Sequence, residues 1–170
     1  MRVLYYTYPY FFDSSIEFIR SISKHVEVFV VIEFTPQNKR GTILDLTPYE
    51  LEVGIASAYP VLKKALPGAV LEYLSDVAEI YFLSYKNEKS IHPDSIIQSF
   101  NLLNLIRKIA PDLIHFEDVS LRCSLGAFLW LNDYPRVIGV HDPEPHSGED
   151  NWRQSLARKL LYRKNAYYVL

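Results

Sequence analysis

Two clusters of ionisable side chains each follow directly on a short apolar run. Glu117-Asp118 follows Leu113–Phe116, and the segment His141–His146, which reads HDPEPH, follows Arg136–Val140. If both runs are neighbouring strands of a parallel sheet, their carboxyl ends meet at one edge, where ligands of open α/β sheets bind. The sequence therefore predicts a substrate site at that edge, and its candidate residues there are Glu117, Asp118, His141, Asp142 and His146.

The segment His141–His146 has three possible roles. Imidazoles and carboxylates are metal ligands, but Pro143 and Pro145 hold the chain extended, so these side chains need not converge on one ion. The segment could instead be a solvated loop that caps a following helix. The third role, a loop that contacts substrate, is favoured because His141 is the first residue after the strand. We therefore expect no metal and take His141 as the candidate catalytic residue.

Glu117 and Asp118 have two readings that the sequence leaves open. A carboxylate beside a neutral histidine can orient a hydroxyl group or tune an acid or base. The same carboxylates could simply stabilise the N-terminus of a following helix, where negative charge is favourable. His115, which lies inside the apolar run, is predicted to be a packed residue rather than a ligand.

The elements that must position these residues show a repeated strand–helix–strand pattern. Between the two runs, Leu121, Leu125, Phe128 and Leu129 have the spacing of a helix face. Earlier in the chain, a strand over Val3–Tyr6, a loop over Thr7–Ser15, a helix to Lys24 and a strand over Val26–Phe34 repeat the pattern. In this first unit Asp13 or Ser14 is the expected N-cap, and Ile16 and Ile19 face inward. The pattern predicts one α/β domain over residues 1–170, a Rossmann-like, doubly wound and mainly parallel sheet.

The remaining segments complete this sheet. Thr47-Pro48-Tyr49-Glu50 has the form of a capping box, which predicts a helix from about Pro48. Further elements are expected as a helix over Tyr59–Ala65 ended by Pro67-Gly68, a strand over Ala78–Ser84, a helix from Pro93 to Ala110 with Ile96, Phe100, Leu103 and Ile106 buried, and a sixth strand over Ala166–Leu170. A parallel sheet seldom ends on an uncovered strand, so we expect a further C-terminal domain after Leu170.

Composition excludes several classes of function. The net charge is −2 in 170 residues, which argues against a nucleic-acid partner. Cys123 is the only cysteine, so no disulfide framework is possible and a reducing compartment fits. The N-terminus does not resemble a signal peptide, and no apolar run approaches the length of a membrane span, so a cytoplasmic protein is expected. Neither a G-x-G-x-x-G nor a Walker pattern occurs, and no nucleophile elbow is present.

Two further segments, one basic and one aromatic, each have two possible roles. Trp152–Lys164 carries five cations and no acid beside Trp152, Leu156 and Leu160. A helix that covers the sheet and turns a basic face to solvent is the favoured interpretation, and peripheral contact with the inner face of a membrane is the alternative. In the aromatic stretch Tyr8–Phe12, Tyr10 could stack on a sugar or lipid, or the rings could pack on Pro9.

The order of motifs resembles the N-terminal half of GT4-type retaining glycosyltransferases of the GT-B fold. The segments PDLIHFED and RVIGVHDPEPHSGE, then a basic helix, then NAYYVL carry this resemblance. It implies that His141 approaches the donor sugar and that the loop Thr7–Ser15, with Tyr10, Asp13 and Ser14 as candidates, lies beside the donor phosphates. The paired glycines of that family loop are replaced here by aromatic residues and Asp13-Ser14, and the family's C-terminal E-x7-E motif is absent.

The function implied by the resemblance is transfer of a sugar from a nucleotide-sugar donor to a hydroxyl of a glycan or lipid-linked acceptor, as in polysaccharide biosynthesis. The fragment alone is expected to be inactive, because the nucleotide-sugar domain of the same chain would lie beyond it. No cofactor other than this donor is implied. The alternatives are a stand-alone α/β ligand-binding or regulatory module, and a metal-dependent hydrolase centred on residues 141–150.

Overall fold

The computed structural model describes residues 1–89, 92–118, 134–139 and 166–169. Its strands are β1 (Arg2–Thr7), β2 (Glu27–Phe34), β3 (Gly54–Ser57), β4 (Glu79–Ser84), β5 (Leu113–Phe116), β6 (Arg136–Gly139) and β7 (Ala166–Val169). Its helices are the short 3₁₀ turn η1 (Pro9–Phe11), α1 (Phe12–Ser23), α2 (Tyr59–Ala65), α3 (Gly68–Glu72) and α4 (Pro93–Ile109). None of the helices in these residues is long and apolar enough to span a bilayer.

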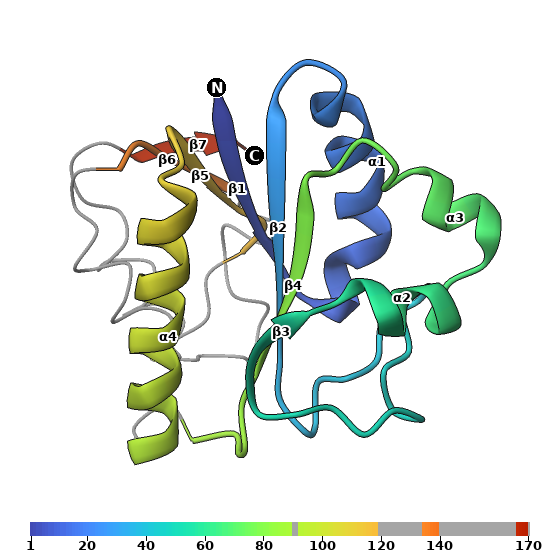
Figure 1. The fold of residues 1–170 in the computed structure, drawn as a ribbon, viewed down its shortest axis with the longest axis vertical. Helices are drawn as coiled ribbons and strands as arrows, with labels where there is room; N and C mark the ends of the chain where they lie inside the picture. The colour runs from blue at the N-terminus through green and yellow to red at the C-terminus, as the bar shows by residue number, and fades with distance from the viewer. Residues whose placement is uncertain (90–91, 119–133, 140–165, 170) are drawn as a thin grey trace, which may run out of the picture.

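All of the strands form one sheet in the order β3-β4-β2-β1-β5-β6-β7 (Figure 1). Among the described strands, the pairs from β4 to β7 are parallel, and the edge strand β3 pairs antiparallel with β4. From β4 to β7 this is the strand order of the Rossmann fold. The predicted doubly wound, mainly parallel sheet is confirmed, including its sixth parallel strand at the C-terminal end of the chain.

Helices pack on both faces of the sheet because the chain adds strands on both sides of β1. It first builds β2 and β4 on one side of β1, and then crosses over through α4 to β5 on the other side. The helices α1, α2 and α3 cover one face and α4 covers the opposite one (Figure 1). The side chains of β1 alternate accordingly: Leu4 and Tyr6 point to the α4 side, whereas Tyr5 points to the α1 side. Ile16 and Ile19 of α1 are buried as predicted. Two apolar layers therefore hold the central strands between them.

The helix predicted from Pro48 is wrong. Residues 47–49 form a turn, in which the N–H of Tyr49 donates to the carbonyl of Leu46. The backbone N–H of Thr47 donates to the carboxylate of Asp45 at 2.9 Å, and its hydroxyl donates to the same oxygen. These two bonds, which lower the pKa of Asp45, turn the Thr47 side chain backward and leave it unable to cap a following helix.

Two smaller expectations also need correction. The edge strand β3 was not predicted, since four residues reading GIAS carry little strand signal. Pro67-Gly68 does end α2 near Leu66, but α3 then begins at Gly68, so the glycine starts a helix as well as following one.

The helix α4 has the predicted bounds to within a residue, but half of its predicted buried stripe is wrong. Leu103 and Ile106 are buried, whereas Ile96 and Phe100 are each 49% exposed. The side that packs on the sheet instead uses Leu102, Leu105 and Ile109, with Ser95 and Gln98 in the first turns. Apolar residues occur on both sides of this helix, so their spacing did not distinguish the inner side from the outer one.

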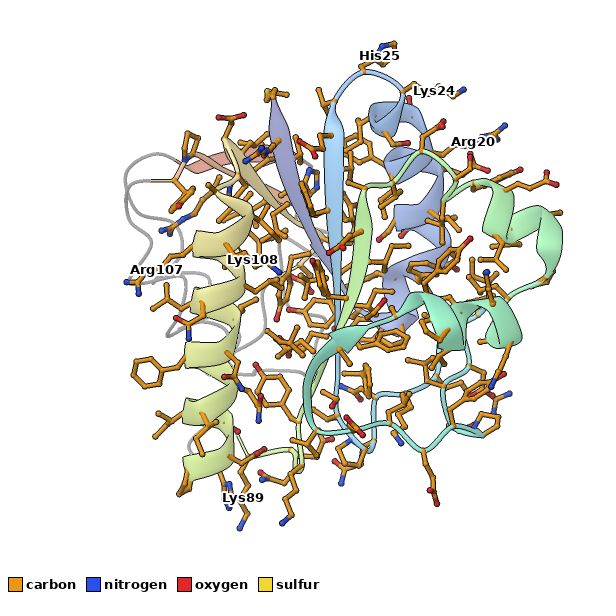
Figure 2. The ribbon with its side chains drawn as sticks, in the orientation of Figure 1. Arg20, Lys24, His25, Lys89, Arg107 and Lys108 are labelled. Atoms are coloured by element: carbon orange, nitrogen blue, oxygen red, sulfur yellow. The ribbon has the colours of Figure 1, made fainter. Side chains whose placement is uncertain are left out.

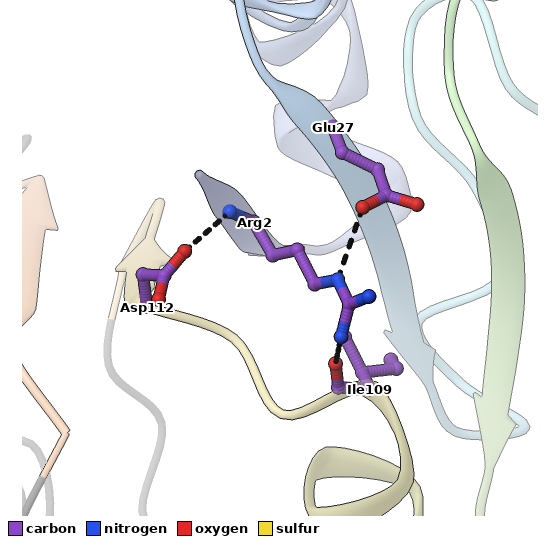
Figure 3. Close-up of polar contacts among 4 residues, drawn as sticks. All are labelled: Arg2, Glu27, Ile109 and Asp112. Atoms are coloured by element: carbon purple, nitrogen blue, oxygen red, sulfur yellow. Dashed lines mark hydrogen bonds and ion pairs between the residues drawn. The ribbon is translucent and has the colours of Figure 1, made fainter.

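Arg2 connects three elements at the amino edge of the sheet (Figure 3). Its backbone N–H donates to Asp112 at 2.7 Å, just before β5, and its Nε donates to Glu27 of β2 at 3.0 Å. Its Nη1 donates to the carbonyl of Ile109 at the end of α4, 3.1 Å away. A cation at a helix C-terminus and its carbonyls is favourable. The first residue of β1 thus sets its alignment with the strands on both sides.

Candidate functional site

The carboxyl ends of β1 and β5 form the point where the sheet changes direction. The chain passes from β1 through α1 to β2 on one side, and from β4 through α4 to β5 on the other. Such a switch point is the usual ligand site of a doubly wound sheet, because the loops diverge there. Tyr6 of β1 lies opposite Phe116 of β5, and the N–H of Glu117 donates to the carbonyl of Tyr6 at 2.9 Å. Glu117 is therefore fixed directly at this point.

The side chain of Glu117 is held from beneath by Tyr5. The Tyr5 hydroxyl donates to Oε2 of Glu117, and the whole glutamate residue is only 8% exposed. A buried carboxylate needs such a donor because removing it from water is costly. Because Tyr5 belongs to the neighbouring strand β1, this hydrogen bond fixes the orientation of the Glu117 carboxylate relative to the sheet. Asp118 follows it and is half-buried.

Tyr5 is in turn packed against His115. Their ring centroids lie 4.6 Å apart in a stacked arrangement, and the ring of Phe18 lies 5.0 Å from that of His115. Burial lowers the pKa of His115 to about 4, so the imidazole is neutral at pH 7. His115 is therefore a packed residue, as predicted, and it supports the residue that holds Glu117.

The first loop places a group of aromatic rings beside the switch point. The rings of Tyr8 and Tyr10 are stacked with centroids 5.3 Å apart, and Phe11 lies 4.5 Å from Tyr10. Tyr8 is buried, whereas Tyr10 is 39% exposed. An exposed ring stacked on a buried one is a rigid apolar surface that needs little ordering on binding a sugar face or an acyl chain. Tyr10, Tyr8 and Phe11 are named here the aromatic shelf.

Three contacts make the aromatic shelf rigid. The Thr7 and Ser15 hydroxyls lie 2.7 Å apart, and Ser15 also donates to the carbonyl of Phe11 at 2.8 Å. From the other side, Gly41 packs so closely that a Cβ on it would lie 1.7 Å from the carbonyl oxygen of Pro9. Only a glycine fits there without displacing the loop.

Asp13 and Ser14 lie in the first turn of α1, not in a preceding loop. The N-cap is Phe11, and it makes no side-chain capping bond, so the predicted capping by Asp13 or Ser14 is wrong. Instead the Ser14 hydroxyl donates to the carbonyl of Phe11 at 2.9 Å, and the Ser14 N–H donates to Asp13 at 2.9 Å. Both side chains are exposed at the N-terminal end of α1, where their edge of the sheet is shared with the aromatic shelf.

Several predicted site residues lie outside the described residues. These are His141, Asp142 and His146, and the segment Trp152–Lys164 lies outside as well. The strand before them is described: β6 pairs in parallel with β5, and a Cβ on Gly139 would lie 2.9 Å from the carbonyl oxygen of Glu117. The end of β6 therefore packs directly on Glu117. Among the described residues, no group of three histidine, cysteine or acidic side chains could hold a metal.

A second buried carboxylate at this edge was not predicted. Glu33 of β2 is fully buried on the α4 side of the sheet, where the Tyr6 hydroxyl donates to its Oε2. Burial, and after it the negative charge of Glu33, raise the pKa of Tyr6 well above its usual value. The signal was present in the strand EVFVVIEF, whose second acid lies between apolar neighbours and on the same face as Val31. The pair Tyr6–Glu33 joins β1 to β2 beneath the aromatic shelf.

Together these residues can position a ligand but show no visible nucleophile. Glu117 supplies a fixed carboxylate, the aromatic shelf supplies a flat apolar surface, and the exposed start of α1 supplies backbone N–H groups and the polar side chains Asp13 and Ser14. This combination suits a ligand with hydroxyl groups on one side and an apolar face on the other.

Comparisons with known proteins found no match in sequence and partial similarity to solved structures. No protein-family model matches the chain, and no curated protein matches it. A glycosyltransferase from Rickettsia africae ESF-5 is similar over 86% of this chain and 31% of that one, with 13% identity and a TM-score of 0.46. The glycotransferase of kitacinnamycin is similar over 81% and 29%, with 14% identity and a TM-score of 0.34. The chain thus spans less than a third of either structure, and its function must be argued from its own residues.

Proposed function

We propose that this chain is the acceptor-side half of a retaining glycosyltransferase, which moves a sugar from a nucleotide-sugar donor to a hydroxyl of a glycan or lipid-linked saccharide. The observation that carries the proposal is the carboxylate of Glu117, fixed by Tyr5 at the switch point beside the aromatic shelf. The motif resemblance over Pro111–Leu170 supports the same reaction.

In this proposal each group has a positioning role. The carboxylate of Glu117, which Tyr5 holds in place through Oε2, accepts a hydrogen bond from a hydroxyl of acceptor or sugar. Tyr10 stacks on an apolar sugar face. His141, which the resemblance brings to the donor sugar, would follow β6, whose end packs on Glu117. Asp118, Asp142 and His146 complete the polar edge.

The donor nucleotide is assigned to a second domain of the same polypeptide, following the GT-B resemblance. Basic groups and helix N-termini of such a domain would stabilise the leaving diphosphate, so the reaction as proposed uses no metal and no cofactor besides the donor. Asp13 and Ser14, at the exposed start of α1, would face these phosphates. The proposed setting is the cytoplasm, with contact to the inner face of a membrane through Trp152–Lys164.

The test is turnover by the full-length polypeptide, measured as nucleotide release from a panel of nucleotide sugars. His141→Ala should lower kcat by tens-fold or more, and Glu117→Gln should lower kcat/KM about tenfold or more, because each removes a contact to reacting groups. Glu27→Gln is the matched control: the same change at the opposite edge of the sheet, beside Arg2, should leave turnover within about twofold.

The outcomes separate the proposal from its rival. If the full-length protein binds a sugar or nucleotide but releases no nucleotide from any donor, the chain is a ligand-binding module and the transferase proposal is wrong. If activity is present but Glu117→Gln and Glu27→Gln behave alike, the site lies elsewhere.

A further inference from the structure

The outer side of α4 combines exposed apolar side chains with cations. Ile96, Ile97 and Phe100 are 49%, 56% and 49% exposed, and they are neighbours on a helix because they are spaced by one, three and four residues. Single exposed apolar residues are ordinary, but three large ones side by side form a continuous patch. The buried side of the same helix already packs on the sheet, so this patch is additional to the core.

Basic side chains lie at both ends of the apolar patch. Asn104, Arg107 and Lys108 continue the same exposed side toward the end of α4, and Lys89 precedes its start; Figure 2 shows Lys89 at one end of the helix and Arg107 and Lys108 in its second half. The rise along a helix places Arg107 roughly 15 Å from Ile97. The whole length of α4 therefore presents one surface, apolar in its first half and cationic at both ends.

Acidic groups near this surface are turned away from it. Asp94 is the only acid in α4, and its carboxylate accepts from the backbone N–H of Lys86 at 2.9 Å. Glu88, next to Lys89, accepts from the backbone N–H of Gln37 at 3.2 Å. In the described residues, then, the exposed side of α4 carries positive charge and no acid of its own.

Figure 2 also labels basic residues at the end of α1, among them Arg20, which has partners within the molecule. Arg20, near the end of α1, lies 4.0 Å over the ring of Tyr73 and pairs with Glu17 at 3.8 Å (Figure 2). It is therefore engaged within the molecule. The apolar patch of α4 and the cations beside it lie on the opposite face of the sheet from α1 and α2.

From this surface we propose that α4 lies on an anionic membrane, with Ile96, Ile97 and Phe100 inserted at the headgroup boundary and Lys89, Arg107 and Lys108 against lipid phosphates. Apolar insertion and cationic attraction act together in interfacial helices of this kind. A second copy of the chain fits less well, because two such surfaces would bring like charges together. Nucleic acid fits less well because the centre of the patch is apolar.

A membrane bound to α4 would lie near the candidate site at Glu117. In a strand–helix–strand crossover the start of the helix lies at the carboxyl ends of the strands, and the start of α4 lies at the same end of the molecule as the ends of β2 and β4 (Figure 1). The apolar patch, in the first two turns of α4, is thus at the edge that carries Glu117 and the aromatic shelf. A membrane docked on it would bring lipid-linked molecules to that edge. The docking itself does not depend on the proposed transfer reaction.

The test is co-sedimentation of the full-length polypeptide with vesicles of phosphatidylcholine, with and without about one third phosphatidylglycerol. The wild-type protein should sediment with the anionic vesicles at low salt, and high salt should release it. The double variant Arg107→Glu, Lys108→Glu should bind at least tenfold more weakly, since each cation near such a surface contributes about 1 kcal/mol. Ile97→Ser with Phe100→Ser should also bind several-fold more weakly, because the inserted area is lost.

Lys63→Glu with Lys64→Glu is the matched control. These two lysines occupy the last turn of α2 on the opposite face of the sheet, so the same reversal of charge should leave binding unchanged. Circular dichroism melts check that each variant is folded, which is expected because all substituted residues are exposed.

Five results would overturn the proposal. Four are no sedimentation by the wild type, equal sedimentation with neutral vesicles, an equal loss in the α2 control, and undiminished binding by the α4 variants, which would leave only the contact proposed above through Trp152–Lys164. Light scattering that shows a dimer broken by Ile97→Ser would assign the patch to self-association instead.

Discussion

At the scale of single residues, His115 connects burial to the pH dependence of stability. Its pKa falls to about 4 in the folded protein because burial disfavours the charged ring, whereas in the unfolded chain it is about 6.5. The unfolded state therefore binds more protons between these two values. Stability is full above pH 6.5 and falls as the pH falls toward 4.

The prediction is a difference between the wild type and His115→Phe. Between pH 7 and pH 4.5 the wild type should lose about 2–3 kcal/mol more unfolding free energy than the variant, which keeps a ring against Tyr5 and Phe18 but cannot titrate. Urea unfolding at both pH values measures this, and the carboxylates common to both proteins cancel in the comparison. Parallel pH dependence in the two proteins would mean that His115 is not desolvated.

The residue scale also shows why Glu33 and Tyr5 were missed. Glu33 lies in an apolar run, and Tyr5 was counted only as part of a buried strand. Each residue has its role because of a hydrogen bond to a residue distant in the sequence. Glu33 accepts from the Tyr6 hydroxyl, and the Tyr5 hydroxyl donates to Glu117. Periodicity reports which residues are buried but not which distant polar group each one meets.

At the scale of elements, the first loop depends on the residue that packs beneath it. A Cβ at Gly41 would lie 1.7 Å from the Pro9 carbonyl oxygen, far inside contact distance, and the obstacle is backbone. Gly41→Ala should therefore lower the free energy of unfolding by about 2 kcal/mol or more and displace the aromatic shelf. Thermal or urea unfolding measures the first effect, and the near-ultraviolet circular dichroism of the tyrosines reports the second.

Gly68→Ala is the control for this substitution. It adds the same methyl group where no other atom lies within 4 Å, at the start of α3, so it should be neutral or stabilise by up to about 1 kcal/mol. If the two variants were equally stable, the close packing of Gly41 under Pro9 would be contradicted.

Elements were predictable where one side of the pattern was apolar and the other was not. The helix α1 satisfies this, and it has the expected place. The strands β1, β2 and β4 were predictable for another reason, because each is a short apolar run that is buried on both faces of the sheet. In α4, Ile96, Ile97 and Phe100 compete with Leu102, Leu103 and Ile106 as the inner side, and only the neighbouring sheet decides between them. At Thr47 a local hydrogen bond to Asp45 overrides a capping signal that is otherwise strong.

At the scale of the whole molecule, the two edges of the sheet have different chemistry. The amino edge is closed by Arg2, whose bonds to Glu27, Asp112 and the end of α4 align the strands. The carboxyl edge carries the fixed carboxylate of Glu117, the aromatic shelf and the exposed start of α1. The repeated strand–helix–strand pattern was enough to place Glu117 at this edge, where a ligand site is predicted. It was not enough to show how Glu117 is held, because that depends on the register between β1 and β5.

The most direct test of the central claim is a crystal structure of the full-length polypeptide with a nucleotide sugar and an acceptor. The account predicts a ligand hydroxyl within about 3 Å of Glu117 and a ring or acyl face against Tyr10, at the carboxyl ends of β1 and β5. A bound ligand at the amino edge beside Arg2, or one that leaves Glu117 and the aromatic shelf untouched, would contradict it.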